Sequence, residues 1–290
     1  MKSRTSRLAT LGWLFQRAWI AAYEDGCFGI AKGVAYSALL SFIPVLTTMT
    51  AILVQANAEA VSIALSRLLF EVVPPGSEEI VRYSFTVRGQ RPLWLLIVAG
   101  LLSVWAASGA MTTLMEGFRA AYRIPKGRPF LRERAMAILL VFGAALPVIG
   151  ASALIVLGGQ VEQWTLTQIG WIHGREQFWG WVRLLSRATG FLIAFAATTG
   201  ANAMTYRFGP NHPAKPRRIW PGAATATALW MALTVAFSWY VRNIANYNVL
   251  YGSIGATIAL LVWMYLLAVT ALVGCEFNAE YDRLEQSLNF

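Results

Sequence analysis

The chain has 290 residues, of which 57% are hydrophobic and 13% charged, and its mean hydropathy is +0.53. A soluble domain carries roughly 25% charged residues, so this composition excludes a soluble globular protein, and it equally excludes a disordered or collagen-like chain. The two cysteines, Cys27 and Cys275, are too few for a disulfide framework. The composition therefore predicts a polytopic membrane protein of the all-α class.

Residues 1–32 are predicted to be a cytoplasmic N-terminal segment. Apolar residues recur in it at helical spacing, namely Leu8, Leu11, Phe15, Ala18, Trp19 and Ala22. Several arginines lie among them, which is typical of an amphipathic helix at the membrane interface. Such a helix either binds or senses lipid or simply rests on the headgroups, and the second interpretation is favoured.

The next 244 residues, 33–276, are predicted to be a membrane domain of six helices, because a span needs about 20 apolar residues. The predicted spans are Gly33–Val54, Leu93–Met115, Met136–Leu157, Leu184–Tyr206, Ile219–Val241 and Gly252–Cys275. The first is long enough to act as an uncleaved insertion signal. Their one Asp, Glu, Lys, Arg or His residue is Arg187, which lies near a span end, where its side chain can reach the headgroups.

Basic residues are distributed unevenly between the two sides of this arrangement. Sixteen Lys and Arg fall on the side of the termini and eight on the other side, which predicts that both termini are cytoplasmic. Residues 277–290 are then a cytoplasmic tail. The net charge of +10 thus follows mainly from topology, and we expect membrane lipids rather than nucleic acid as partners.

Uncharged polar residues within the predicted spans are the candidate contacts for a substrate. They are Ser37, Ser41, Pro44, Asn202, Thr205 and Thr234. One interpretation is a cavity that accommodates an amphiphile, since the span cores contain no Asp, Glu or His for ion coupling. The other is hydrogen bonding between helices, which needs no substrate. Small residues along the second and third spans favour close helix packing and also allow a homo-oligomer.

A second candidate set surrounds the sixth predicted span. Tyr251 precedes it and Gly252 begins it, and Glu276 and Asn278 are predicted to follow it at the cytoplasmic interface. These residues could form a gate or a headgroup contact, or they could only position the helix ends. We expect an arginine to pair with Glu276, with Arg207 and Arg119 as the first candidates.

Four segments resemble conserved patterns of the BrkB/YihY family of bacterial inner-membrane proteins. They are Ala31–Pro44 (AKGVAYSALLSFIP), Arg207–Gly222 with its Gly-Pro-Asn and Trp-Pro-Gly, Tyr247–Gly255 (YNVLYGSIG) and Gly274–Ala279 (GCEFNA). The resemblance covers about residues 25–278. Arg119 departs from it, because the family pattern favours an asparagine there.

The resemblance implies six membrane helices with both termini inside, in the bacterial inner membrane. It does not imply a reaction: the family was formerly labelled a ribonuclease, and suggestions within it favour transport or envelope-lipid handling. A nuclease needs an acid–base pair or clustered metal ligands, whereas His173 and His212 are predicted on opposite sides of the membrane. No catalytic residue, metal or cofactor is predicted.

The function predicted from the sequence is therefore non-enzymatic. The first hypothesis is transport or accommodation of an amphiphile or lipid at the cytoplasmic membrane. The alternative is a scaffold, without transport activity, for envelope machinery. A ribonuclease, as in the older family label, is the least favoured hypothesis.

Overall fold

The computed structural model describes residues 4–55, 93–125, 127–168, 176–211, 219–243 and 253–288. Within these ranges the chain is helical, with no strand, as the sequence predicted. The helices are α1 (Arg4–Glu24), α2 (Cys27–Gln55), α5 (Leu93–Ala121), α6 (Phe130–Gln168), α7 (Glu176–Phe208), α8 (Trp220–Asn243) and α10 (Ser253–Leu288).

Five stretches of these helices are long and apolar enough to cross a membrane. They are Cys27–Ile52, Ile97–Ala121, Phe130–Ala151, Trp220–Val241 and Ile254–Ser287. The predicted fourth span lies in α7, which is helical but is not one of the five. Its sequence is more polar, because it includes Arg187, Asn202 and several threonines. The structure thus supports a multi-span membrane protein, and the number six stays a prediction.

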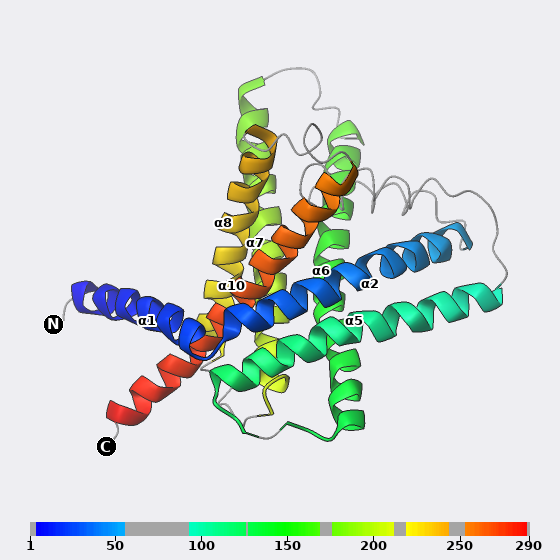
Figure 1. The fold of residues 1–290 in the computed structure, drawn as a ribbon. Coiled ribbons are helices and arrows are strands. Elements are labelled where there is room, and N and C mark those ends of the chain that lie inside the picture. The colour runs from blue at the N-terminus through cyan, green and yellow to red at the C-terminus, as the bar shows by residue number, and fades with distance from the viewer. Residues whose placement is uncertain are drawn as a thin grey trace.

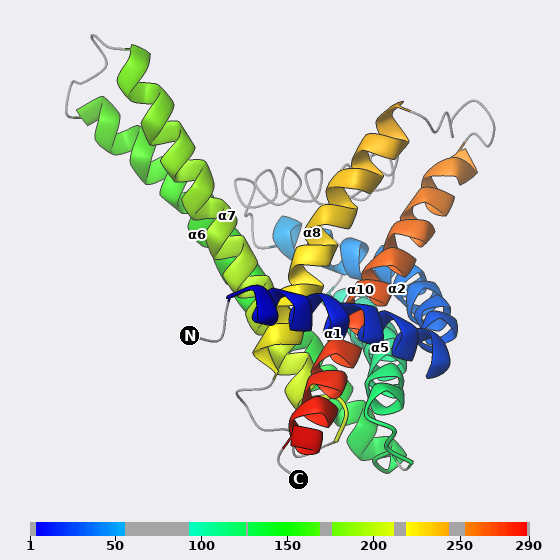
Figure 2. The ribbon, with the colours of Figure 1, turned by 90° about the vertical axis from the view of Figure 1, so that its left-hand side faces the viewer.

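Six of the helices form three antiparallel pairs, α2–α5, α6–α7 and α8–α10, which meet at one end of the molecule and diverge from there (Figures 1 and 2). We call the end where they meet the base. The largest cluster of buried side chains lies in this region and draws on every helix except α6. It includes Ala31 of α2, Phe118 of α5, Tyr206 of α7, Ala226 of α8 and Leu272 of α10.

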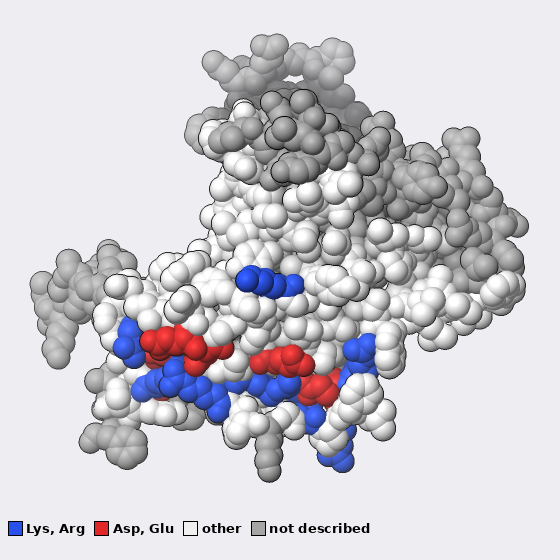
Figure 3. Space-filling model, viewed as in Figure 1, with Lys and Arg blue, Asp and Glu red and all other residues white. Residues whose placement is uncertain are grey.

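Charged side chains gather in a band at the base, below an almost uncharged surface (Figure 3). Beyond the base, the diverging helices expose large apolar side chains, for example Leu101 on α5, Leu139 on α6 and Leu192 on α7. Most of the apolar stretch of α10, by contrast, is buried. This distribution is that of a helical protein whose outer faces contact lipid and whose central helix is α10.

Helix α1 confirms the helix predicted in the N-terminal segment and shows what its two faces do. Leu14 and Ala18 are buried against Phe277 of α10, with Tyr281 and Leu284 alongside. The aromatic residues of α1 are exposed instead, and they include Trp13, Trp19 and Tyr23. Part of the apolar face that the sequence suggested for the membrane surface therefore packs on protein instead.

Helix α10 differs from the prediction at its C-terminal end. The predicted sixth span ended at Cys275, whereas the helix continues to Leu288. A helix of 36 residues is about 54 Å long, which exceeds the roughly 30 Å of the hydrocarbon core. Hydropathy identifies where the apolar stretch ends, and the helix itself continues because α1 packs on its polar extension.

Candidate functional site

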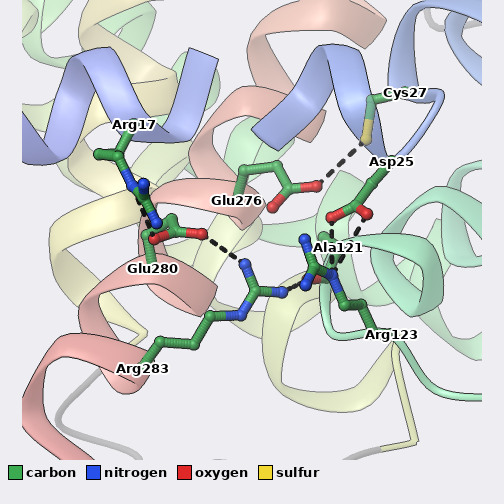
Figure 4. A network of polar contacts seen from close by, with 8 residues as sticks. All are labelled: Arg17, Asp25, Cys27, Ala121, Arg123, Glu276, Glu280 and Arg283. Carbon is green, nitrogen blue, oxygen red and sulfur yellow. Dashed lines mark hydrogen bonds and ion pairs between the residues drawn. The ribbon is translucent and has the colours of Figure 1, made fainter. Parts of the chain in front are cut away.

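The base brings together the charged residues that lie far apart in the sequence. Glu276 and Asn278 were predicted to follow the sixth helix, but they lie inside α10, and both side chains are fully buried. Glu280 lies one turn further on and Arg283 two turns further on, on the same side of α10, at the i+4 and i+7 positions from Glu276. This face of α10 meets α1, the start of α2 and the end of α5 (Figure 4).

Among the described residues, Glu276 has one weak hydrogen-bond donor and no arginine partner. Its Oε1 accepts from the Cys27 thiol at 3.4 Å, and its Oε2 has no partner among the described residues. Arg119 instead pairs with Glu133, and the guanidinium of Arg207 lies 5.7 Å from the ring of Phe208. The prediction that Arg119 or Arg207 holds Glu276 is therefore wrong: Arg119 has an acid opposite it across the short α5–α6 turn.

The arginines nearest to Glu276 are bound to other groups. Arg283 donates to Glu280 Oε1 at 2.5 Å and to the carbonyl of Ala121 at 2.7 Å, which ties α10 to the end of α5. Arg17 of α1 lies 3.7 Å from Glu280 Oε2. Arg123 pairs with Asp25 at 3.3 Å. These contacts, drawn in Figure 4, fasten α1, α5 and α10 to one another while leaving one Glu276 oxygen unpaired.

The turn between α1 and α2 places Asp25 and Cys27 in this network. The amide of Asp25 donates to the carbonyl of Ala21 at 2.8 Å, and Gly26 follows in the left-handed conformation with φ 72°. Glycine adopts this conformation without steric cost, so α1 can end here and α2 can begin in a new direction.

Tyr122, which follows α5, is also part of the base. Burial raises the pKa of its phenol well above the ordinary value.

Asn278 joins the two motif segments that the sequence singled out. Its Oδ1 accepts from the amide of Gly222 at 2.7 Å, and its Nδ2 donates to the carbonyl of Ile219 at 3.0 Å. The side chain therefore caps the first turn of α8 from α10. Gly222 and Gly274 face each other so closely that a Cβ on Gly274 would lie 2.7 Å from the Gly222 carbonyl oxygen.

The polar residues of the first predicted span lie in α2. Ser41 is buried and donates to the carbonyl of Ala38 in its own helix at 2.8 Å, whereas Ser37 is half-buried. Pro44 lies inside α2, which continues on both sides of it. One turn further, the Thr48 and Ser103 hydroxyls lie 2.8 Å apart, and this hydrogen bond links α2 to α5.

The polar residues of the fourth and fifth predicted spans join α7 to α8. Asn202 Nδ2 donates to Thr227 Oγ1 at 3.1 Å, and Thr199 donates to the same oxygen at 3.2 Å. Thr205 donates to the carbonyl of Asn202 at 2.8 Å within α7. Thr234 is different: its Oγ1 is buried and has no partner in the part of the chain that the structure describes.

The structure thus places the candidate residues at three locations rather than one. Ser37, Ser41 and Pro44 lie in α2, Asn202 and Thr205 in α7 with Thr234 in the adjoining α8, and Glu276 and Asn278 lie at the base. Tyr251 and Gly252 lie outside the described residues. Among the residues that are described, no group of three or more His, Cys, Asp and Glu side chains is arranged to hold a metal ion.

Sequence reasoning missed Cys27, Asp25, Arg283 and Glu280 as neighbours of Glu276. A signal existed for two of them, because Glu276, Glu280 and Arg283 share a helical face once the helix is extended past Cys275. No local sequence pattern indicates Cys27 and Asp25, because their approach to α10 depends on how α1 and α2 cross that helix.

These features define a class, that of multi-span α-helical membrane proteins with a charged base at one end of the helices. The family model named virulence factor BrkB matches residues 18–289, so the chain belongs to the BrkB family, as its motifs predicted.

Curated relatives are similar over most of this chain. YfkH of Bacillus subtilis (strain 168), named a ribonuclease-like protein, is 29% identical over 84% of this chain and 86% of its own length. A UPF0761 membrane protein of Alkalilimnicola ehrlichii is 28% identical over 88% of this chain but only 55% of its own length. Another, from Tolumonas auensis, is 23% identical over 90% of this chain and 82% of its own. No solved structure matches the chain.

Proposed function

We propose that this protein accommodates or transports an amphiphile, with a lipid as the simplest case, at the bacterial inner membrane. The observation that carries the proposal is a set of buried polar atoms without partners among the described residues. They are Thr234 Oγ1 and Trp230 Nε1 on α8 and Trp263 Nε1 on α10. In an apolar environment each unpaired group costs about 1–3 kcal/mol.

The pairing of α8 with α10 places two of these groups at a similar level. Gly222 contacts Gly274, and the two helices run antiparallel from that point (Figure 1). Thr234 lies twelve residues beyond Gly222, and Trp263 lies eleven residues before Gly274. Because both helices rise by about 1.5 Å per residue, the two side chains lie at nearly the same distance from the base.

An amphiphile fits these groups chemically. The indole N–H groups need acceptors, and the ester or phosphate oxygens of a lipid supply them. Trp263 packs among Leu46, Phe237 and Leu260, which suit acyl chains. The apolar outer faces of α5 and α6 support a position surrounded by lipid. The absence of Asp, Glu and His from the predicted span cores favours a lipid over an ion-coupled substrate.

The charged base supports the predicted topology of six spans with both termini in the cytoplasm. The termini lie toward the end of the molecule that carries the charged band (Figures 1 and 3), and the predicted excess of basic residues on the side of the termini favours the cytoplasm for that end. The exposed aromatic face of α1 supports an interfacial helix, with Arg17 lying 5.4 Å from the ring of Trp13. The function proposed is non-enzymatic, with membrane lipids as partners.

A scaffold for envelope machinery is the second candidate, and different contacts favour it. The Asn202–Thr227 and Thr48–Ser103 hydrogen bonds satisfy polar groups between helices without any substrate. If all intramembrane polar residues serve in this way, the helices form a rigid support for other proteins. A homo-oligomer is compatible with either function.

Lipid analysis of the protein in native membrane particles separates the two candidates. We expect a specific lipid to be enriched over the surrounding membrane, and the Thr234→Val, Trp263→Phe double variant to lose that enrichment several-fold. Thr189→Val is the matched control, because Thr189 is exposed on α7 and its hydroxyl bonds to its own helix. Equal lipid composition in all three proteins would reject the proposal in favour of the scaffold.

A further inference from the structure

Arg134 is a half-buried arginine whose charge has no acidic partner among the described residues. It lies one turn into α6 and crosses to α5, where Nη2 donates to the carbonyl of Trp105 at 2.8 Å. The guanidinium carbon lies 4.1 Å from the centroid of the Trp105 ring. Its Nε is buried without a hydrogen-bond partner.

The acid next to Arg134 in the sequence is paired with other arginines. Glu133, the preceding residue, pairs with Arg119 and lies 3.8 Å from Arg128. A guanidinium that is partly removed from water and lacks a counter-ion is destabilising, and an anion that binds beside it offsets this cost. Nη1 points past Gly109, where an added Cβ would lie 3.9 Å away, so glycine leaves this side of the guanidinium uncrowded.

Two further features point to an anion carried by a lipid. Trp105 is exposed on α5, so a lipid molecule can reach the guanidinium that is stacked on it. Arg134 also lies near the N-terminus of α6, a helix of 39 residues, whose positive dipole end favours negative charge. A planar guanidinium stacked on an indole is well suited to hold a phosphate.

We propose that Arg134 and Trp105 form a binding site for the phosphate of a phospholipid at the cytoplasmic leaflet. The phosphate oxygens accept from Nη1, and the lipid glycerol and chains lie along the exposed apolar face of α5, which includes Leu101 and Leu102. This site is independent of the proposed transport, because a lipid held here stabilises the α5–α6 contact whether or not any lipid is moved.

The test measures the affinity of the detergent-solubilised full chain for a short-chain phosphatidylglycerol by native mass spectrometry. Arg134→Gln is expected to raise the dissociation constant about tenfold, the size typical of losing a charge-assisted hydrogen bond. Arg132→Gln is the control, because Arg132 is exposed two residues earlier and faces another direction on the helix. Equal weakening by both variants would mean non-specific attraction and would overturn the proposal.

Further variants and a competition with inorganic phosphate complete the test. Arg134→Lys keeps the charge but not the stacked fork, so we expect weakening of about threefold to fivefold, and this variant decides the matter if Arg134→Gln does not fold. An unchanged affinity of Arg134→Lys together with an unchanged affinity of Trp105→Leu would overturn the site. If inorganic phosphate displaces the lipid at equal concentration, the site binds free phosphate, and the assignment to a phospholipid is wrong.

Discussion

Asn278 offers the sharpest test of how the two motif segments are held together. In the native protein its side chain satisfies the amide of Gly222 and the carbonyl of Ile219, at 2.7 and 3.0 Å, and it is fully buried. Replacing it by alanine removes both hydrogen bonds at once. Water cannot readily take its place, because Gly274 and the first turn of α8 close around it.

The size of the effect follows from the two groups left unpaired. Each buried amide or carbonyl without a partner costs about 1–3 kcal/mol, so Asn278→Ala should lower the free energy of unfolding by roughly 2–6 kcal/mol. Taking about 4 kcal/mol as the central value, the melting temperature should fall by about 8–16 °C for a chain of this size. Asn278→Asp retains the acceptor but loses the donor and buries a charge, so we expect it to be no more stable than Asn278→Ala.

The measurement is thermal unfolding in detergent micelles, with Asn243→Ala as the matched control. Asn243 lies on α8, the helix that Asn278 caps, but it is exposed, and among the described residues its side chain donates only to the carbonyl of Trp239. Its replacement should change stability by no more than about 0.5 kcal/mol. The reasoning is refuted if Asn278→Ala costs no more than Asn243→Ala, because the cap would then contribute nothing that water could not.

Three further predictions concern topology, packing and the buried carboxyl group. Cysteines introduced as Arg4→Cys and Ser287→Cys should react with an impermeant maleimide only in inverted vesicles, and labelling of intact cells at either position contradicts the cytoplasmic assignment. Gly274→Ala should cost about 1–3 kcal/mol by overpacking, because its Cβ would lie 2.6 Å from a neighbouring Cβ, whereas Gly200→Ala meets nothing within 4 Å and should be neutral or stabilising in thermal unfolding. Glu276→Gln should keep or raise the melting temperature because it removes a buried charge without a cationic partner, and a fall as large as that of Glu276→Ala would show that the charge itself stabilises the fold.

The sequence predicted the helical class and most of the spans because hydropathy reports directly on the membrane. The predicted Gly33–Val54, for example, lies inside α2, and Ile219–Val241 overlaps α8 almost completely. Helix ends were predicted less well: the predicted sixth span ends at Cys275, whereas the helix continues to Leu288 and packs on α1 there.

The partners of buried charges could not be predicted, because they depend on how helices cross. The pairing of Arg119 with Glu133 joins residues 14 apart across a short turn and was within reach of sequence reasoning. The approach of Cys27 to Glu276 joins residues 249 apart and depends on the direction that α2 takes after Gly26. No pattern in the sequence specifies that direction.

Packing explains some of the residues in the two motif segments at the base, but not all of them. Gly222 and Gly274 are required by the close contact of α8 with α10, and Asn278 by the amide and carbonyl that it satisfies. Glu276 is not explained in this way, because a glutamine of the same shape would accept from Cys27 equally well and would bury no charge. Packing and hydrogen bonding therefore account for Gly222, Gly274 and Asn278. They do not account for the carboxyl group of Glu276, so its acidity, rather than its shape, calls for a functional explanation.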